Sequence, residues 1–434
     1  MRVVVVGAGP VGSFSALMLA RRGHEVVLVD RDPGPVDGGS WARRGMMQFN
    51  LPHFFRPQVR QSICAETPEL WSALLLAGGL PARPEGFPEE MTGLQSRRAT
   101  FERAVWTFLD AEPGVSRLCG HADRLLLGGG RVTGVVVDGA AVTADLVVVA
   151  SGRAGRVGDD IRPAAESASC GFSYAARQYR ALPGVDLPDW GMPRYRIYDG
   201  YLTIVFPQDA QTLSALIVRP TADAGLLELR HNGVFEAAAA AIPFLAEWTD
   251  PARFEPITDV LSGSNLVNAY RRQARAGDRY VDGVVFVGDA VLTTNPAAGR
   301  GVALGLQQAR MLVSLLDGSD IPTAVAAFEA WCDTNMRPWY EDHVYWDETL
   351  LRRFMGYGLD LDARIPSDVV VECAQVDPSI FAAAGPYLAM LALPSVLDGV
   401  QDKARAVLRT GWRPSYADGP TRDDLVDLMM QPVA

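Results

Sequence analysis

Apolar residues follow two patterns along the chain, and each predicts a different kind of sheet. Continuous aliphatic runs are typical of parallel strands buried on both faces, and they occur at residues 2–6, 24–30, 144–150 and 283–287. Longer alternating stretches are typical of antiparallel strands, and they occur at residues 194–198, 201–206 and 213–218. The sequence therefore predicts an α/β domain interleaved with a second domain built on an antiparallel sheet.

Helices are predicted between and after these strands. Apolar positions recur at helical spacing in residues 11–22, 59–77, 97–111, 234–248 and 301–316, and the chain is mostly helical from about residue 323. A hairpin is predicted from strands at 124–127 and 131–137, because three glycines separate them.

Composition narrows the class of protein. The 434 residues suffice for two domains, and a net charge of -11 argues against a nucleic-acid-binding surface. Five cysteines and five histidines are dispersed, which indicates reduced thiols in a cytoplasmic protein and no metal centre. Prolines interrupt the apolar stretch at 380–397, so a buried or subunit-contact helix pair is expected there instead of membrane association.

The first motif with a chemical meaning joins the first strand to the first helix. It reads Gly7-Ala8-Gly9-Pro10-Val11-Gly12. Glycines at these positions permit a tight turn, a close approach of the backbone to a pyrophosphate, and close helix–strand packing. Asp30, followed by Arg31, ends the second strand, where its carboxylate can accept from ribose hydroxyls. The alternative is a glycine-rich turn of some other α/β protein, but the motif with Asp30 predicts a dinucleotide site.

A second motif lies about 280 residues later. Gly288-Asp289 ends the last buried strand, and Asp289 can accept from ribityl hydroxyls. The segment from Pro296 through Gly299 and Arg300 to Gly301 then opens a helix, whose N-terminus can stabilise negative charge on a flavin pyrimidine. Alone, Gly288-Asp289 is better explained as a turn. Joined to the first motif it predicts FAD, because FMN has neither the adenosine ribose nor the pyrophosphate.

Together these motifs resemble the FAD-dependent monooxygenases of the p-hydroxybenzoate hydroxylase type. Three further segments resemble the branch that contains squalene epoxidase and the actinobacterial polyether epoxidases. They are Arg43-x-Gly45-Met46-x-Gln48, the run from Gln95 through Arg98 to Glu102, and residues 144–156, and the match spans about residues 1–345 in order. In the last segment Ser151 stands where the family often has aspartate.

The resemblance implies a fold and a reaction. It implies a Rossmann-like FAD-binding domain (1–77, 97–170 and 265–340), interleaved with an antiparallel-sheet substrate domain (78–96 and 171–264), plus a helical C-terminal region (341–434). It implies that Arg43 and Arg98 lie near the flavin and that Ala122 passes the adenine. The implied reaction is hydroxylation or epoxidation through a flavin C4a-hydroperoxide, with O2, on an apolar or aromatic small molecule such as a natural-product intermediate.

Catalytic groups are harder to find in the sequence. A hydroxylase needs a base to ionise a phenol, whereas an epoxidase needs none. Candidate bases are His53, Tyr174, Tyr198 and Tyr201. The alternative for each of them is a purely structural role. The substrate pocket is predicted between the antiparallel sheet and the flavin, with walls that include Phe172, Tyr174, Tyr201 and Phe206.

The source of electrons and the assembly stay open. A single dinucleotide fingerprint leaves NADPH or NADH docking directly, which we favour, or a separate flavin reductase as partner. A flavin-dependent dehydrogenase or oxidase and a non-catalytic flavin-binding protein are the alternative functions, and a homodimer is one option for the assembly. Halogenation is disfavoured, because the W-x-W-x-I-P segment of tryptophan halogenases is absent from the sequence.

Overall fold

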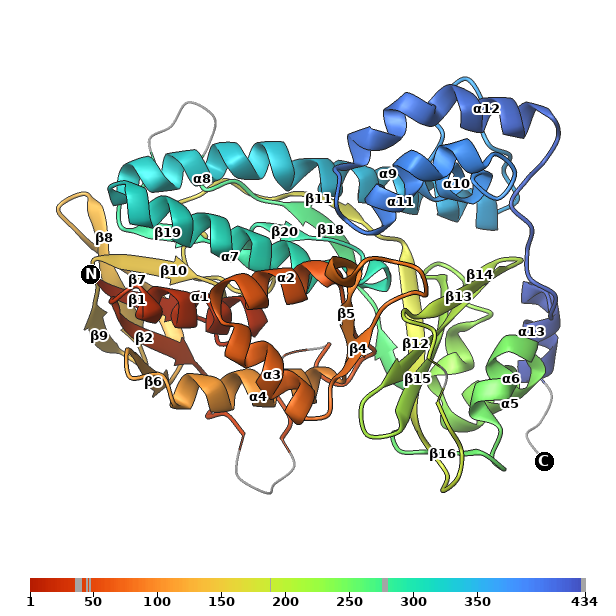
Figure 1. The fold of residues 1–434 in the computed structure, drawn as a ribbon, viewed down its shortest axis with the longest axis horizontal. Helices are drawn as coiled ribbons and strands as arrows, with labels where there is room; N and C mark the ends of the chain where they lie inside the picture. Colours follow the sequence, from red (N-terminus) through yellow and green to blue (C-terminus); the bar gives the residue numbers. More distant parts are fainter. Residues whose placement is uncertain (36–40, 44–45, 47, 188, 275–279, 431–434) are drawn as a thin grey trace.

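A computed structural model describes the chain except residues 36–40, 44–45, 47, 188, 275–279 and 431–434 (Figure 1). Its centre is a five-stranded parallel sheet in the order β19-β10-β1-β2-β6. The strands are β1 (Arg2–Val6), β2 (Glu25–Asp30), β6 (Val115–Cys119), β10 (Leu146–Val149) and β19 (Val284–Phe286). The aliphatic runs predicted as parallel strands form β1, β2, β10 and β19, and the side chains from Val3 to Val6 are buried.

Six helices that pack on one another lie at the first βαβ crossover of this sheet. They are α1 (Pro10–Arg21), α2 (Pro57–Glu66), α3 (Pro68–Leu76), α4 (Arg98–Asp110), α7 (Gly301–Gly318) and α8 (Ile321–Asn335). Helix α7 packs directly on α1 (Figure 1). The single helix predicted at 59–77 is two helices, because Pro68 has no N–H to continue the first and opens the second at its N1 position.

Three small sheets frame the parallel sheet. The predicted hairpin forms β7 (Ala122–Gly128) and β8 (Arg131–Val137), which β9 (Ala140–Thr143) extends. A second small sheet has β3 (Phe54–Phe55), β5 (Gly93–Gln95) and β4 (Leu80–Ala82), and a third has β11 (Glu166–Ser169), β18 (Val267–Tyr270) and β20 (Leu292–Thr293).

The antiparallel sheet lies beside this body, toward the right of Figure 1. Its strands are β12 (Phe172–Ala181), β13 (Arg194–Tyr198), β14 (Tyr201–Gln208), β15 (Thr212–Pro220), β16 (Phe254–Pro256) and β17 (Leu261–Gly263). One face packs on α5 (Asn232–Ala241) and α6 (Pro243–Thr249), which Pro243 separates. The other face carries Tyr174, Phe206 and Leu216 toward the parallel-sheet body.

The remaining helices are α9 (Arg337–Phe354), α10 (Ser367–Cys373), α11 (Phe381–Leu388), α12 (Gln401–Arg409) and α13 (Arg422–Met430). The chain then crosses back, and α13 packs on α5 behind the antiparallel sheet (Figure 1). Within the described ranges, none of the helices has the length and apolar character needed to cross a bilayer. The combination of parallel sheet, antiparallel sheet and helical C-terminal region confirms the predicted fold class; the predicted domain boundaries stay a prediction.

Candidate functional site

A cavity of about 530 Å³ opens where the parallel strands end and reaches the antiparallel sheet. Its walls include Gly7 and Gly9 after β1, Asp30 at the end of β2, Ser151 after β10 and Asp289 after β19. In open α/β sheets, ligands bind at this carboxyl edge of the strands. The residues that the two sequence motifs single out therefore meet at one site.

The first motif forms a cradle without side chains. Gly7 has a φ of +103°, and a Cβ there would lie 2.5 Å from the carbonyl oxygen of Ala150. Gly12 lies behind the cavity wall, where a Cβ would come within 1.8 Å of the Gly7 carbonyl oxygen. Helix α1 begins at Pro10 with Val11 on the cavity and no side-chain cap, so the positive end of the helix faces the cavity.

Asp30 fixes this cradle and keeps an acceptor position. Its Oδ2 accepts from the backbone N–H of Ala8 (2.6 Å) and from Nη2 of Arg43 (2.8 Å), and its Oδ1 accepts from the N–H of Asp32 (2.8 Å). A carboxylate has about four acceptor positions. One position on Oδ1 therefore remains for a ribose hydroxyl at the cavity surface.

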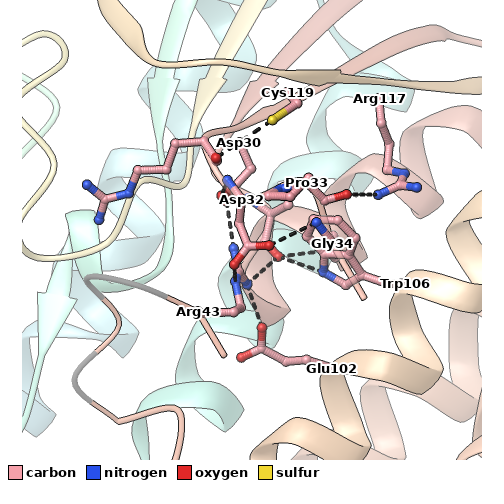
Figure 2. Close-up of polar contacts among 12 residues, drawn as sticks. Asp30, Asp32, Pro33, Gly34, Arg43, Glu102, Trp106, Arg117 and Cys119 are labelled. Carbon is pink, nitrogen blue, oxygen red and sulfur yellow. Dashed lines mark hydrogen bonds and ion pairs between the residues drawn. The ribbon is translucent and has the colours of Figure 1, made fainter. Parts of the chain in front are cut away.

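Arg43 is enclosed by carboxylates (Figure 2). It forms ion pairs with Asp30, Asp32 and Glu102, and its Nη1 also donates to the Ala8 carbonyl oxygen (2.9 Å). Burial opposes its charge, but the carboxylates of Glu102 and Asp30 prevail and raise the pKa of Arg43. Arg43 lines the cavity while its donors serve this network, and its place near the flavin stays a prediction.

Arg98 shares the same carboxylate. Its Nε donates to Oε1 of Glu102, one turn later on α4, and its Nη1 lies 3.5 Å from Nε2 of His53. Nδ1 of His53 lies 2.8 Å from the Leu51 carbonyl oxygen, so it carries the proton and Nε2 faces Arg98. Burial, with help from Arg98, lowers the pKa of His53 to about 3, which keeps the imidazole neutral.

The second motif supplies the opposite wall. The side chain of Asp289 is open to the cavity but lies deep in the protein, and this burial raises its pKa, partly offset by Arg98 and Arg153. Helix α7 starts at Gly301 with no side-chain cap, and its first-turn residues Gly301, Val302 and Ala303 line the cavity. Gly288, Pro296 and Gly299 also lie on the wall.

Arg300 differs from the prediction. Its side chain is fully buried away from the cavity, over the rings of Trp339 and Tyr387, with Nη1 3.1 Å from Nε2 of His343. A guanidinium stacked on aromatic rings between helices cannot also turn toward the cofactor. Arg300 therefore attaches the loop before α7 to the C-terminal helices.

A ring of hydrogen bonds also fixes the loop before α7, and the sequence did not predict this ring. Asp347 on α9 accepts from the side-chain amides of Asn268 (2.7 Å) and Asn295 (2.8 Å), while the N–H of Asn295 donates to Oδ1 of Asn268 (2.8 Å). Oδ1 of Asn295 in turn accepts from the N–H of Ala297 (3.0 Å), which lies on the cavity wall. Burial raises the pKa of Asp347 to about 6.

The far part of the cavity is an apolar chamber. Its walls include Tyr174 and Phe206 of the antiparallel sheet with Leu51, Leu216 and Leu266. Tyr201 and Tyr198 do not reach it, because they stack on each other on the opposite face, where the Tyr201 hydroxyl donates to the Pro420 carbonyl oxygen (2.8 Å).

Some of the remaining predicted residues line the cavity and others do not. Phe172 packs edge-on against Phe354 and is not on the wall. Arg31 and Ala122 line the cavity beside Asp30. Met46 and Gln48, from the motif that begins at Arg43, also line the cavity, whereas Gly45 lies outside the described residues.

These features fit FAD. A glycine cradle and the open α1 N-terminus suit a pyrophosphate, Asp30 retains an acceptor for a ribose hydroxyl, and Asp289 together with the α7 N-terminus suits the ribityl chain and the flavin ring. Among the described residues, His, Cys, Asp and Glu side chains do not form a cluster that could hold a metal ion.

Comparison with known proteins gives the same class. Residues 2–157 match the family described as FAD dependent oxidoreductase. A kynurenine 3-monooxygenase of Salinispora arenicola (strain CNS-205) is 28% identical over 358 residues, which are 76% of this chain and 75% of that protein. The fold is that of the p-hydroxybenzoate hydroxylase-like FAD monooxygenases, and the chain is an FAD-dependent oxidoreductase.

Two solved structures illustrate the likeness in fold. PqsL, a probable FAD-dependent monooxygenase from Pseudomonas aeruginosa, has a TM-score of 0.61 at 18% identity, over 82% of this chain and 98% of its own. A triple mutant of the flavin-dependent brominase Bmp2 has a TM-score of 0.63 at 18% identity, over 94% of this chain and 97% of its own. At this identity the likeness describes the fold and not the reaction.

Proposed function

We propose that the protein is an FAD-dependent monooxygenase that inserts one atom of O2 into a flat, apolar or aromatic small molecule, with electrons from NADH or NADPH. Substrate, O2, NAD(P)H and a proton would give oxygenated substrate, water and NAD(P)+. The observation that carries the proposal is one continuous cavity, with dinucleotide-binding features at one end and an apolar chamber at the other. The name of the kynurenine 3-monooxygenase relative supports oxygenation as the reaction.

Residues of both motifs would hold the cofactor. Gly7 and Gly9 leave space for the pyrophosphate, Asp30 would accept from a ribose hydroxyl, and Asp289 would accept from the ribityl chain. When bound, FAD supplies the activation of O2 and the transfer of one oxygen atom. The N-terminus of α7 places partial positive charge where it favours negative charge on the ring system.

The chamber residues would position substrate and exclude water. Phe206, Leu216 and Leu266 provide apolar walls. His53, proposed from the sequence as a base, is neutral and already faces the Arg98 guanidinium. We therefore assign His53 to the support of Arg98, and the proposal includes no side-chain base.

The test uses purified protein with its own cofactor. Heat release should yield FAD and not FMN. Anaerobic stopped-flow mixing with NADH or NADPH, with aromatic probes present, should bleach the bound FAD, and ¹⁸O2 should then place one labelled atom in the product. Release of FMN, or bleaching by an organic substrate without NAD(P)H, would overturn the monooxygenase proposal. Bleaching only after a purified reductase is added would replace direct NAD(P)H use by a partner protein.

A further inference from the structure

Tyr174 has an unused hydroxyl at the wall of the apolar chamber. Its side chain is only 6% exposed, yet the hydroxyl makes no hydrogen bond to another residue that the structure describes. The hydroxyl is not among the enclosed atoms that lack a partner, so it opens onto the chamber and is free to bond a group that enters there. Two other tyrosines of this sheet have partners: Tyr179 on β12 donates to Glu236, and Tyr201 on β14 donates to the Pro420 carbonyl oxygen.

The position of this hydroxyl is fixed by a glycine on the adjacent strand. Tyr174 on β12 pairs with Gly263 on β17. A Cβ at Gly263 would lie 2.2 Å from Cζ and 2.6 Å from the hydroxyl oxygen of Tyr174. The ring therefore occupies the space that a side chain at position 263 would take, and the absence of that side chain sets where the hydroxyl sits.

The surroundings make the hydroxyl a donor. Burial raises the pKa of Tyr174, so the phenol keeps its proton at neutral pH. The neighbouring wall residues Phe206, Leu216 and Leu266 are apolar and leave its donor capacity unused. Arg153 lies on the same cavity and favours electron-rich groups nearby.

We propose that Tyr174 determines specificity by donating a hydrogen bond to a carbonyl-type oxygen of the substrate. The substrate would then be a flat apolar molecule with an exocyclic ketone, amide or carboxylate oxygen, and not a pure hydrocarbon. This assignment rests on the proposed function, because it identifies the chamber as the substrate site. It adds the polar group that the substrate must present and the residue that reads it.

The experiment compares two probes of nearly equal shape. In 2-acetylnaphthalene a C=O group stands where 2-isopropenylnaphthalene has C=CH2. Titration calorimetry of the FAD-loaded protein gives the ratio of the two Kd values for wild type and for Tyr174→Phe. Loss of one hydrogen bond should change that ratio by about fivefold to tenfold against the ketone. An unchanged ratio, or binding of neither probe to wild type, would overturn the proposal.

Two further variants separate position from presence. Gly263→Ala keeps the hydroxyl but displaces the ring, so it should also lose the ketone preference. Tyr201→Phe removes a buried hydroxyl from the opposite face of the sheet and should keep that preference; a loss there equal to that in Tyr174→Phe would reject the assignment. FAD content and reduction by NAD(P)H, measured on the same samples, test the proposed function separately. Intact FAD chemistry with an unchanged ratio rejects Tyr174 alone, whereas absence of FAD rejects the function.

Discussion

Two buried polar networks hold different walls of the cavity, and they balance charge in different ways. The network around Arg43 joins two arginines to three carboxylates, so each buried charge has a partner of opposite sign. The ring around Asp347 joins one carboxylate to two neutral amides. Both fix backbone at the cavity, but only in the first network does every charged side chain have a partner of opposite charge.

The difference predicts how each network fails. Removing one partner of a buried ion pair leaves an uncompensated charge, which is strongly destabilising. A carboxylate held by amides can instead take up a proton, and the raised pKa of Asp347 indicates that it does so near pH 6. The stability of the Arg43 network should therefore be sensitive to the loss of one partner, and that of the Asp347 ring to pH.

The largest effect is expected from Glu102→Ala. Arg98 loses its carboxylate and Arg43 loses one of three, so the free energy of unfolding should fall by about 3–5 kcal/mol. Glu69→Ala is the control, because Glu69 pairs with Arg21 at the surface and its loss should cost far less than the loss of Glu102. Urea denaturation of both variants measures the two losses in free energy of unfolding. Equal losses would show that the buried network stabilises the protein no more than a surface ion pair does.

A smaller effect is expected from Asp289→Ala, which asks whether the carboxylate near Arg98 holds the cofactor. FAD should bind about tenfold to a hundredfold more weakly, because a charge-assisted hydrogen bond is lost. His53→Ala should weaken FAD binding far less. Fluorescence titration of apoprotein with FAD gives both values, and wild-type affinity in Asp289→Ala would remove this residue from the cofactor site.

The smallest effect concerns pH and Asp347. Its folded pKa of about 6 lies above the unfolded value, so between roughly pH 4 and 6 the folded state binds more protons and stability falls as pH rises. Asp347→Asn removes this titration. Relative to wild type, the variant should gain about 1–2 kcal/mol from pH 4 to pH 7. A difference between Asp347→Asn and wild type that does not change with pH would contradict the raised pKa of Asp347.

The two networks also differ in how far the sequence could predict them. Arg43, Arg98 and Asp30 belong to segments with recognisable spacing, and Glu102 lies four residues after Arg98, the separation of neighbours on one helix face. The network could have been inferred from that spacing. What spacing does not show is that three carboxylates surround the Arg43 guanidinium.

The Asp347 ring had almost no signal. Asn268, Asn295 and Asp347 are far apart in the chain and meet only through the packing of α9 on β18 and β20. Asn295 before Pro296 could have been recognised as a cap, since its side chain accepts from Ala297. For the tyrosines, the strands were predicted correctly but not the face that meets the cavity, since both faces of the antiparallel sheet are buried.

The burial of Arg300 has a consequence for how this site can change over generations. Its guanidinium is enclosed by Trp339 and Tyr387 on α9 and α11. The conformation of the segment 295–301 therefore depends on side chains from two helices that are remote in sequence. A loop transplanted from a related enzyme with a smaller residue at position 300 would leave a void lined with aromatic rings. Directed evolution of this loop should therefore advance through paired exchanges with positions 339 and 387, and libraries confined to the loop should yield few folded clones.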